Sequence, residues 1–146
     1  MKRGDFRRPN RAIGAVVAAL AGVLLVTSSA TATIIYNLGT LGGRESYGAA
    51  VNNAGQVSGG SWLTGSAAYH GFRYDGAPGS GGIMRDLGTF GGPNSYSFAI
   101  NDAGQVTGSS EITGTPFRHA FHYDGTPGSG GVMRDLGTLG GEHSYG

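Results

Sequence analysis

The sequence predicts an all-β fold of antiparallel four-stranded repeat units, arranged as an incomplete β-propeller-like array. Three observations lead to this prediction. A Leu-Gly-Thr-Leu/Phe-Gly-Gly element begins at Leu38, Leu87 and Leu136, so its copies are 49 residues apart, and a fixed period of this size is typical of repeat architectures. Each unit contains four short strand-like segments separated by turn residues. No helical periodicity follows residue 32.

The repeat divides the chain into two complete units, 38–86 and 87–135, and a third that runs from 136 to 146. The complete units align without a gap and are identical at 30 of 49 positions, while the third matches the first at nine of eleven. Natural repeat arrays usually end in an atypical capping copy. Because the third copy keeps the consensus, we expect the chain to be a truncated fragment. Further repeats, or other chains, would then be needed to close the fold.

The strand-like segments of the second unit span 83–87, 95–100, 105–110 and 117–123. Tyr96, Phe98 and Ile100 alternate with small residues, so we expect a half-buried strand whose large side chains face inward. Four strands in a unit of this length fit a propeller blade. A parallel β-solenoid is the competing architecture, but its coils are usually shorter and lack hairpin turns.

The turns of the second unit also follow from residue type. Asn101-Asp102-Ala103-Gly104 has the composition of a hairpin loop whose glycine adopts positive φ. Gly108 lies inside a strand, which predicts that another backbone passes close to it. His119, Phe121 and Tyr123 are two residues apart and are expected to share one strand face.

Residues 1–32 have the pattern of a signal peptide, which leaves 33–146 as the repeat domain. Five basic residues precede an apolar run from Ile13 to Val26, and Ala30-Thr31-Ala32 supplies a cleavage site. The run is shorter than the roughly 20 residues of a membrane span. An uncleaved membrane anchor is the alternative. We expect a protein that is secreted or held at the cell surface, with no membrane segment after cleavage.

Charge and composition narrow the classes of partner. Five of the ten basic residues but only one of the nine acidic residues precede residue 33, so the remainder carries a formal net charge of −3. Nucleic acid is therefore not an expected partner, because its binding requires clustered Lys and Arg. The chain has no cysteine, and 27 of its 30 glycines lie after residue 32. Strand pairing and core burial, rather than disulfides, must hold this glycine-rich chain together.

The motifs resemble those of the HAF-repeat family of exported bacterial proteins. The family tripeptide stands here as His119-Ala120-Phe121, and the run from Ala99 to Val106 is its usual companion. The first unit departs from the tripeptide at Gly71. The match covers residues 38–146. It implies an extracellular, propeller-like protein and assigns no activity, and some members carry a C-terminal sorting signal that is not found here.

Residues with catalytic or metal-binding chemistry recur once per unit, which favours structural roles. His70 and His119 occupy equivalent positions, and each is expected to form a hydrogen-bonding strap on a packed strand. The recurring Asp residues are expected in turns and at strand ends, although paired carboxylates could serve glycoside hydrolysis. No calcium, phosphate-loop or nucleophile-elbow pattern is present. We expect no catalytic residue, no metal and no cofactor.

The two complete units differ most between positions 58 and 73, which hold ten of their 19 differences. Recognition usually resides in loops on a rigid scaffold, although exposed turns also drift without function. The candidate recognition turns therefore contain five residues, namely Trp62, Tyr69, Glu111, Phe117 and Arg118. We expect a binding or scaffold module, not an enzyme, whose partner is a glycan or a cell-surface protein. The alternative is a fragment of a propeller-type polysaccharide hydrolase or lyase that uses Glu111 and His122.

Overall fold

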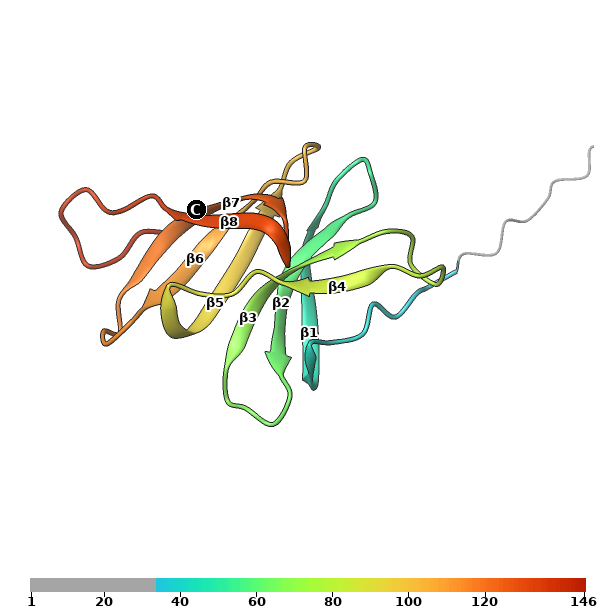
Figure 1. The fold of residues 1–146 in the computed structure, drawn as a ribbon, viewed down its shortest axis with the longest axis horizontal. Helices are drawn as coiled ribbons and strands as arrows, with labels where there is room; N and C mark the ends of the chain where they lie inside the picture. The colour runs from blue at the N-terminus through green and yellow to red at the C-terminus, as the bar shows by residue number, and fades with distance from the viewer. Residues whose placement is uncertain (1–33) are drawn as a thin grey trace, which may run out of the picture. The chain divides into compact units, whose positions relative to one another are not determined.

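A computed structural model describes residues 34–146, which contain eight strands and no helix (Figure 1). The strands are β1 Gly42–Val51, β2 Val57–Leu63, β3 Tyr69–Asp75, β4 Ile83–Asp86, β5 Gly91–Ile100, β6 Val106–Ile112, β7 Arg118–Thr126 and β8 Ser129–Asp135. The all-β prediction is confirmed. In this part of the chain no helix is long and apolar enough to cross a membrane. The expected signal peptide, 1–32, lies outside the described residues.

The eight strands form one open sheet. Antiparallel pairs join β1 to β2, β2 to β3 and β3 to β4, and the same order holds from β5 to β8. A parallel contact between Tyr69 of β3 and Asn94 of β5 links the two sets. We refer below to β1–β4 as the first strand set and to β5–β8 as the second. The propeller-like array remains a prediction.

The place of β4 corrects one detail of the sequence interpretation. The strand pattern assigns the segment 83–87 to the second unit, but Ile83–Asp86 pairs with β3, the strand before it. The Leu-Gly-Thr-Phe-Gly-Gly element therefore follows the last strand of one set and leads into the next. Leu87 then turns inward, with 6% of its surface exposed, and packs with Val106, Phe121 and Tyr123. This cluster is the core of the second strand set.

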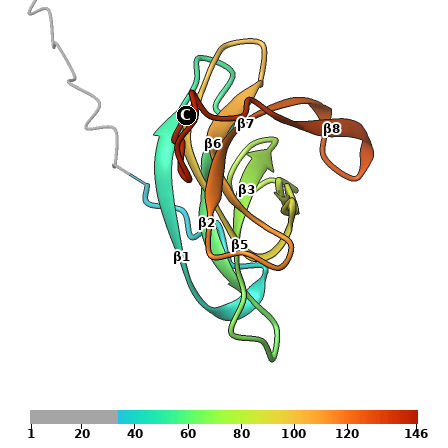
Figure 2. The same ribbon diagram turned by 90° about the vertical axis from the view of Figure 1, so that its left-hand side faces the viewer.

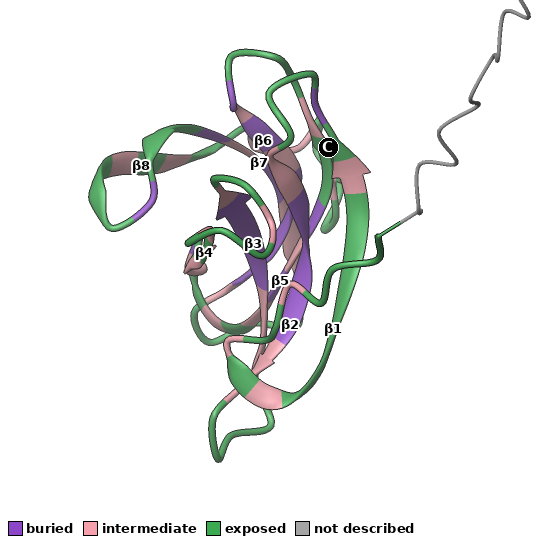
Figure 3. Cartoon of the chain, turned by 90° about the vertical axis from the view of Figure 1, so that its right-hand side faces the viewer, coloured by how far each residue is buried: buried purple, intermediate pink, exposed green. Residues whose placement is uncertain are grey.

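The alternation along β5 holds from Ser95 to Ser97, but the buried face there is the serine face and not the predicted aromatic one. Ile100, as predicted, packs against the core, after a register shift in the pairing with β6. Ser95 and Ser97 are buried, at 0% and 4% exposure, whereas Phe98 is 43% exposed. The reason is that the serine face packs against β3: a side chain added at Gly71 would meet Ser97. Small residues permit this close approach of two backbones. The buried residues accordingly gather on the inner strands of both sets, while β1 is mostly exposed (Figure 3).

The predicted hairpin loops are confirmed in both sets. Gly104 donates its N–H to the Asn101 carbonyl at 2.9 Å and has a φ of +77°. The two hairpins lie next to each other (Figures 1 and 2). Asn53 donates its backbone N–H and its side-chain amide to the Asp102 carboxylate, at 3.0 and 2.8 Å. These hydrogen bonds lower the pKa of Asp102.

A serine side chain joins the second and the third Leu-Gly-Thr turn to the strand set before it. Ser95 Oγ accepts the Gly71 N–H at 2.9 Å and donates to the Gly88 carbonyl at 2.6 Å. In the third copy, Ser144 Oγ makes the same two contacts, with the Ala120 N–H at 2.8 Å and with the Gly137 carbonyl at 2.5 Å. We call this arrangement the serine bridge. It recurs one repeat unit later.

Arg73 makes a second connection between the strand sets. Its side chain is 6% exposed and pairs with Asp75 at 2.8 Å within the first set. Its Nη1 donates to the carbonyls of Gly104 and Gly125, at 2.6 and 3.0 Å, in the second. A buried charge requires this number of partners, because its desolvation is costly. Arg73 thus connects β3 to the β5–β6 hairpin and to the end of β7.

Candidate functional site

The recurring histidines pair with the recurring aspartates. His70 Nδ1 lies 2.9 Å from the Asp86 carboxylate, and His119 Nδ1 lies 2.9 Å from Asp135. Asp135 also accepts the Gly137 N–H at 2.7 Å. Burial acts to raise the pKa of Asp135, but the hydrogen bonds from Gly137 and His119 outweigh it and the pKa is lowered. The His70–Asp86 pair therefore connects β3 to the end of β4, and the His119–Asp135 pair connects β7 to the end of β8.

The serine nearest to His119 in the strand register is hydrogen-bonded to the backbone. Ser110 lies directly across the sheet from His119. Its hydroxyl accepts the Phe90 N–H at 2.8 Å and donates to the Glu111 carbonyl at 3.2 Å, so it is engaged by the backbone. Among residues 34–146, no three His, Asp or Glu side chains gather closely enough to hold a metal ion.

The candidate recognition residues lie at strand ends beside the variable turns. Trp62 lies near the end of β2 and pairs with Tyr69 at the start of β3. Glu111 and Arg118 form the equivalent pair between β6 and β7. Phe117 alone lies in a turn, immediately before β7. Trp62 and Glu111 thus lie in strands rather than in turns, because β2 and β6 extend about two residues beyond the predicted ends. Tyr69 and Arg118 lie in the strands expected to follow, and Phe117 lies just before β7 instead of within it.

Four of the five candidates belong to one contact chain that crosses both strand sets. The rings of Trp62 and Tyr69 meet edge to face, with centroids 5.4 Å apart, and Tyr69 lies 5.2 Å from Tyr96. The Arg118 guanidinium then lies 4.7 Å from the Tyr96 ring centre. Burial raises the pKa of Tyr69, and the neighbouring Tyr96 adds to this effect. Aromatic pairs in these geometries stabilise one another beyond their buried area.

Glu111 and Arg118 form a closed ion pair at the far end of this chain. Arg118 Nη2 lies 2.9 Å from Glu111 Oε1, and Asn94 Nδ2 donates to Glu111 Oε2 at 2.8 Å. Burial acts to lower the pKa of Arg118, but its hydrogen bond to Glu111, together with the electrostatic effects of Tyr96, Glu111 and Tyr145, outweighs burial and the pKa is raised. Both carboxylate oxygens of the buried Glu111 are therefore occupied. This geometry suits a structural pair better than a general acid or base, which must reach a substrate.

Phe117 lies apart from the other candidates. Its ring packs edge to face against His143 of the third copy, with centroids 5.7 Å apart. The Arg118 N–H donates to His143 Nδ1 at 3.1 Å, in the place where the Tyr69 N–H donates to Asn94. Phe117 thus contacts the junction with the third copy.

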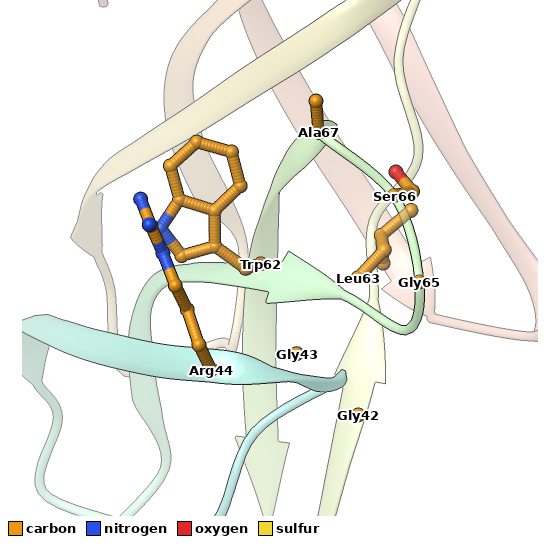
Figure 4. A pocket seen from close by; sticks show the side chains of 8 residues that line it. All are labelled: Gly42, Gly43, Arg44, Trp62, Leu63, Gly65, Ser66 and Ala67. Carbon is orange, nitrogen blue, oxygen red and sulfur yellow. The ribbon is translucent and has the colours of Figure 1, made fainter.

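Trp62 borders a broad hollow of about 660 Å³ (Figure 4). The hollow lies between the start of β1, the end of β2 and the turn that follows β2. Its lining residues are Gly42, Gly43, Arg44, Trp62, Leu63, Gly65, Ser66 and Ala67. The lining is mainly apolar with a few polar groups, which is the usual character of ligand sites in this size range.

Two neighbours hold the indole of Trp62 in place. The Arg44 guanidinium lies 4.5 Å from the ring centre, and the Trp62 Nε1–H donates to Glu45 Oε1 at 3.0 Å. Arg44 in turn pairs with Glu45 at 3.5 Å. The indole of Trp62 therefore has a partner for its N–H and a cation over its ring, both from exposed side chains of β1.

Comparison of the chain with protein-family models, with curated proteins and with solved structures found no match.

Sequence reasoning missed Arg44, Glu45 and Tyr96, which complete the site. Arg44 and Glu45 are also positions at which the two units differ, since Pro93 and Asn94 stand there in the second. This difference was a usable signal. It lies outside the segment where differences concentrate, and only the pairing of β1 with β2 brings it beside Trp62.

Proposed function

We propose that this chain is an extracellular binding module, not an enzyme, and that its ligand site is the hollow beside Trp62. The strand sets act as the rigid scaffold, in keeping with blades of a propeller-like array completed by further repeats or other chains. The observation that carries the proposal is the half-buried indole of the chain's single tryptophan. It is fixed by Arg44 and Glu45 at the edge of a mainly apolar hollow.

The site is specific to the first strand set, which fits recognition better than scaffold packing. The equivalent position in the second set is Glu111, whose side chain points into the pair with Arg118 and Asn94. Pro93 stands where the first set has Arg44. Residues that vary on a constant framework are the usual carriers of specificity.

The alternative, polysaccharide cleavage by Glu111 and His122, requires the two side chains to act at one bond. Arg118, the strand partner of Glu111, is four positions from His122 along β7. At about 3.3 Å per residue, this places the two roughly 13 Å apart along the sheet. Carboxylates of glycosidases act across about 5–10 Å, so a binding function is favoured.

The test is retention of the full chain on a panel of immobilised polysaccharides and purified cell-surface proteins. Ala67→Arg introduces a long side chain into the hollow without removing a contact of Trp62. We expect this variant to lose retention on the ligand that the unaltered chain binds. The matched control is Pro116→Arg, at the equivalent position of the second set, which should bind normally. Equal retention of both variants on every bound ligand would contradict the proposed site.

Cleavage is measured on the same polysaccharides as the release of new reducing ends. We expect none above background. Release of reducing ends that disappears in Glu111→Gln, while the variant keeps its thermal stability, would replace the binding function with the enzymatic one.

A further inference from the structure

We propose that the occupant of the hollow is an uncharged sugar ring belonging to a neutral polysaccharide, with its C–H face against Trp62. This inference rests on the proposed function and names the ligand class of that site. It is supported by the shape and lining of the hollow, by its charge balance and by the aromatic row that leads away from it.

The lining combines an apolar wall with exposed backbone. Trp62, Leu63 and Ala67 provide the apolar part, whereas Gly42, Gly43 and Gly65 bring the main chain to the surface. Ser66 accepts the Ala68 N–H at 2.8 Å, which leaves its hydroxyl proton for a ligand. A pyranose ring has the complementary character, because its faces carry C–H groups and its rim carries hydroxyls. Ligand sites generally pair such apolar walls with a few polar groups that fix orientation.

The charges around the hollow favour a neutral ligand over an ionic one. Arg44 is the one charged residue among those that line the hollow. Its guanidinium is already shared between the Trp62 ring and the Glu45 carboxylate. A carboxylated or sulfated sugar would have to compete with Glu45. A cationic ligand would meet the arginine itself.

The aromatic row indicates a polymer. From Trp62 the rings of Tyr69 and Tyr96 continue across β3 and β5, each within 5.4 Å of the one before. Tyr47 and Tyr96 also border a smaller hollow beside Tyr69. A chain of sugar residues can contact these surfaces in succession, whereas a single sugar would use only Trp62.

The dimensions of the hollow disfavour a protein partner. A stable protein interface buries about 800 Å² on each side. The hollow is a local depression bounded by the turn after β2. It is lined by the start of β1 and the end of β2, so a protein partner would find only a small part of such an area there.

The single tryptophan makes the site directly observable. The full chain is titrated with soluble hydroxyethylcellulose, xyloglucan and glucomannan as neutral probes, and with polygalacturonate and chitosan as charged probes, while tryptophan emission is recorded. We expect a saturable change with at least one neutral probe. The affinity should fall at least about tenfold in Ala67→Arg, remain unchanged in Pro116→Arg, and be unaffected by raising salt from about 0.05 to 0.5 M.

Other outcomes overturn the inference in distinguishable ways. A response confined to polygalacturonate or chitosan and abolished by salt would show that the ligand is charged, while the proposed binding site stands. A protein partner whose binding is lost in Ala67→Arg, with no saccharide response, would reject the saccharide and keep the site. Failure of every saccharide and protein probe to distinguish Ala67→Arg from Pro116→Arg would remove both the inference and the proposed function.

Discussion

At the scale of single residues, glycine and aspartate positions carry the clearest constraints. Gly108 has no space for a side chain: a Cβ atom there would overlap the Tyr96 carbonyl oxygen and lie 2.8 Å from the Phe121 ring. This confirms that another backbone passes close to it. Gly48, in the exposed β1, has only ordinary contact with Val57, at 3.5 Å. The two glycines lie in similar strands and differ in how tightly they are packed.

Gly108→Ala should therefore lower the free energy of unfolding by about 1–3 kcal/mol, because the added methyl group forces the neighbouring backbone or Phe121 to move. Gly48→Ala is the matched control and should stay within about 0.5 kcal/mol of the unaltered chain. Urea unfolding followed by circular dichroism measures both. Equal effects of the two substitutions would show that strand glycines here are limited by conformational entropy rather than by space.

Asp135 makes stability depend on pH. Its pKa in the folded chain is lowered, so its ionised form is favoured by folding. The contribution is fully present above the unfolded value of about 3.9 and is lost as the pH falls through the lower folded value. We expect the melting temperature to drop between about pH 4.5 and pH 2.5, and to drop less in Asp135→Asn. Parallel curves for both proteins would show that Asp135 contributes nothing to acid sensitivity.

At the scale of elements, the serine bridge decides how one strand set meets the next. Ser95 is fully buried, whereas Ser46, its counterpart in β1, is exposed and donates only to the Gly39 carbonyl, at 2.7 Å. Ser95 thus has two hydrogen-bond partners where the strand sets meet, whereas Ser46 has one. Comparing the same substitution at Ser95 and at Ser46 therefore measures how much the serine bridge contributes to stability.

Ser95→Ala should cost about 1–3 kcal/mol, since it leaves the buried Gly71 N–H and the Gly88 carbonyl without a partner. Ser46→Ala should cost less than about 0.5 kcal/mol, as for other exposed substitutions. Thermal and urea unfolding provide the comparison. A Ser95→Ala protein as stable as Ser46→Ala would indicate that water replaces the hydroxyl at the junction.

Turn chemistry and strand pattern were readable from the sequence, but the contacts between strand sets were not. The Asn-x-Ala-Gly hairpins and the shared face of His119 and Phe121 follow from local residue type and period. The burial of Ser95 does not, because it depends on β3 lying alongside β5. Trp62 could be identified from the sequence because it differs between the two units. Its contact with Arg44 could not, because that contact depends on the pairing of β1 with β2.

At the scale of the whole described chain, Arg73 couples the two strand sets. Its guanidinium reaches the Gly104 and Gly125 carbonyls, and no other charged side chain among the described residues is buried across this junction. Removing it leaves Asp75 with Arg85, at 3.2 Å, and Gln56, at 2.7 Å, as partners, and leaves two carbonyls without a donor. The connection between sets should therefore weaken more than either set alone.

Arg73→Ala should lower the free energy of unfolding by about 3 kcal/mol, the cost of breaking a buried pair. Hydrogen exchange should rise first in the hairpins around Gly55 and Gly104, where the sets meet. His122→Ala, at the equivalent position of β7, should cost about 1 kcal/mol or less. A uniform rise in exchange over all strands would show that the two sets unfold as one unit without a separable junction.

The serine bridge has an evolutionary consequence. Ser95 and Ser144 accept hydrogen bonds from equivalent backbone N–H groups of the preceding strand set. A duplicated segment one repeat long can therefore make the same contact with the strand set before it. Gene duplication can thus lengthen the array without inventing a new contact. Arg73 breaks this equivalence, since His122 stands in its place one period later. The serine contacts are therefore the same in successive copies, whereas the arginine contact distinguishes one junction from the next.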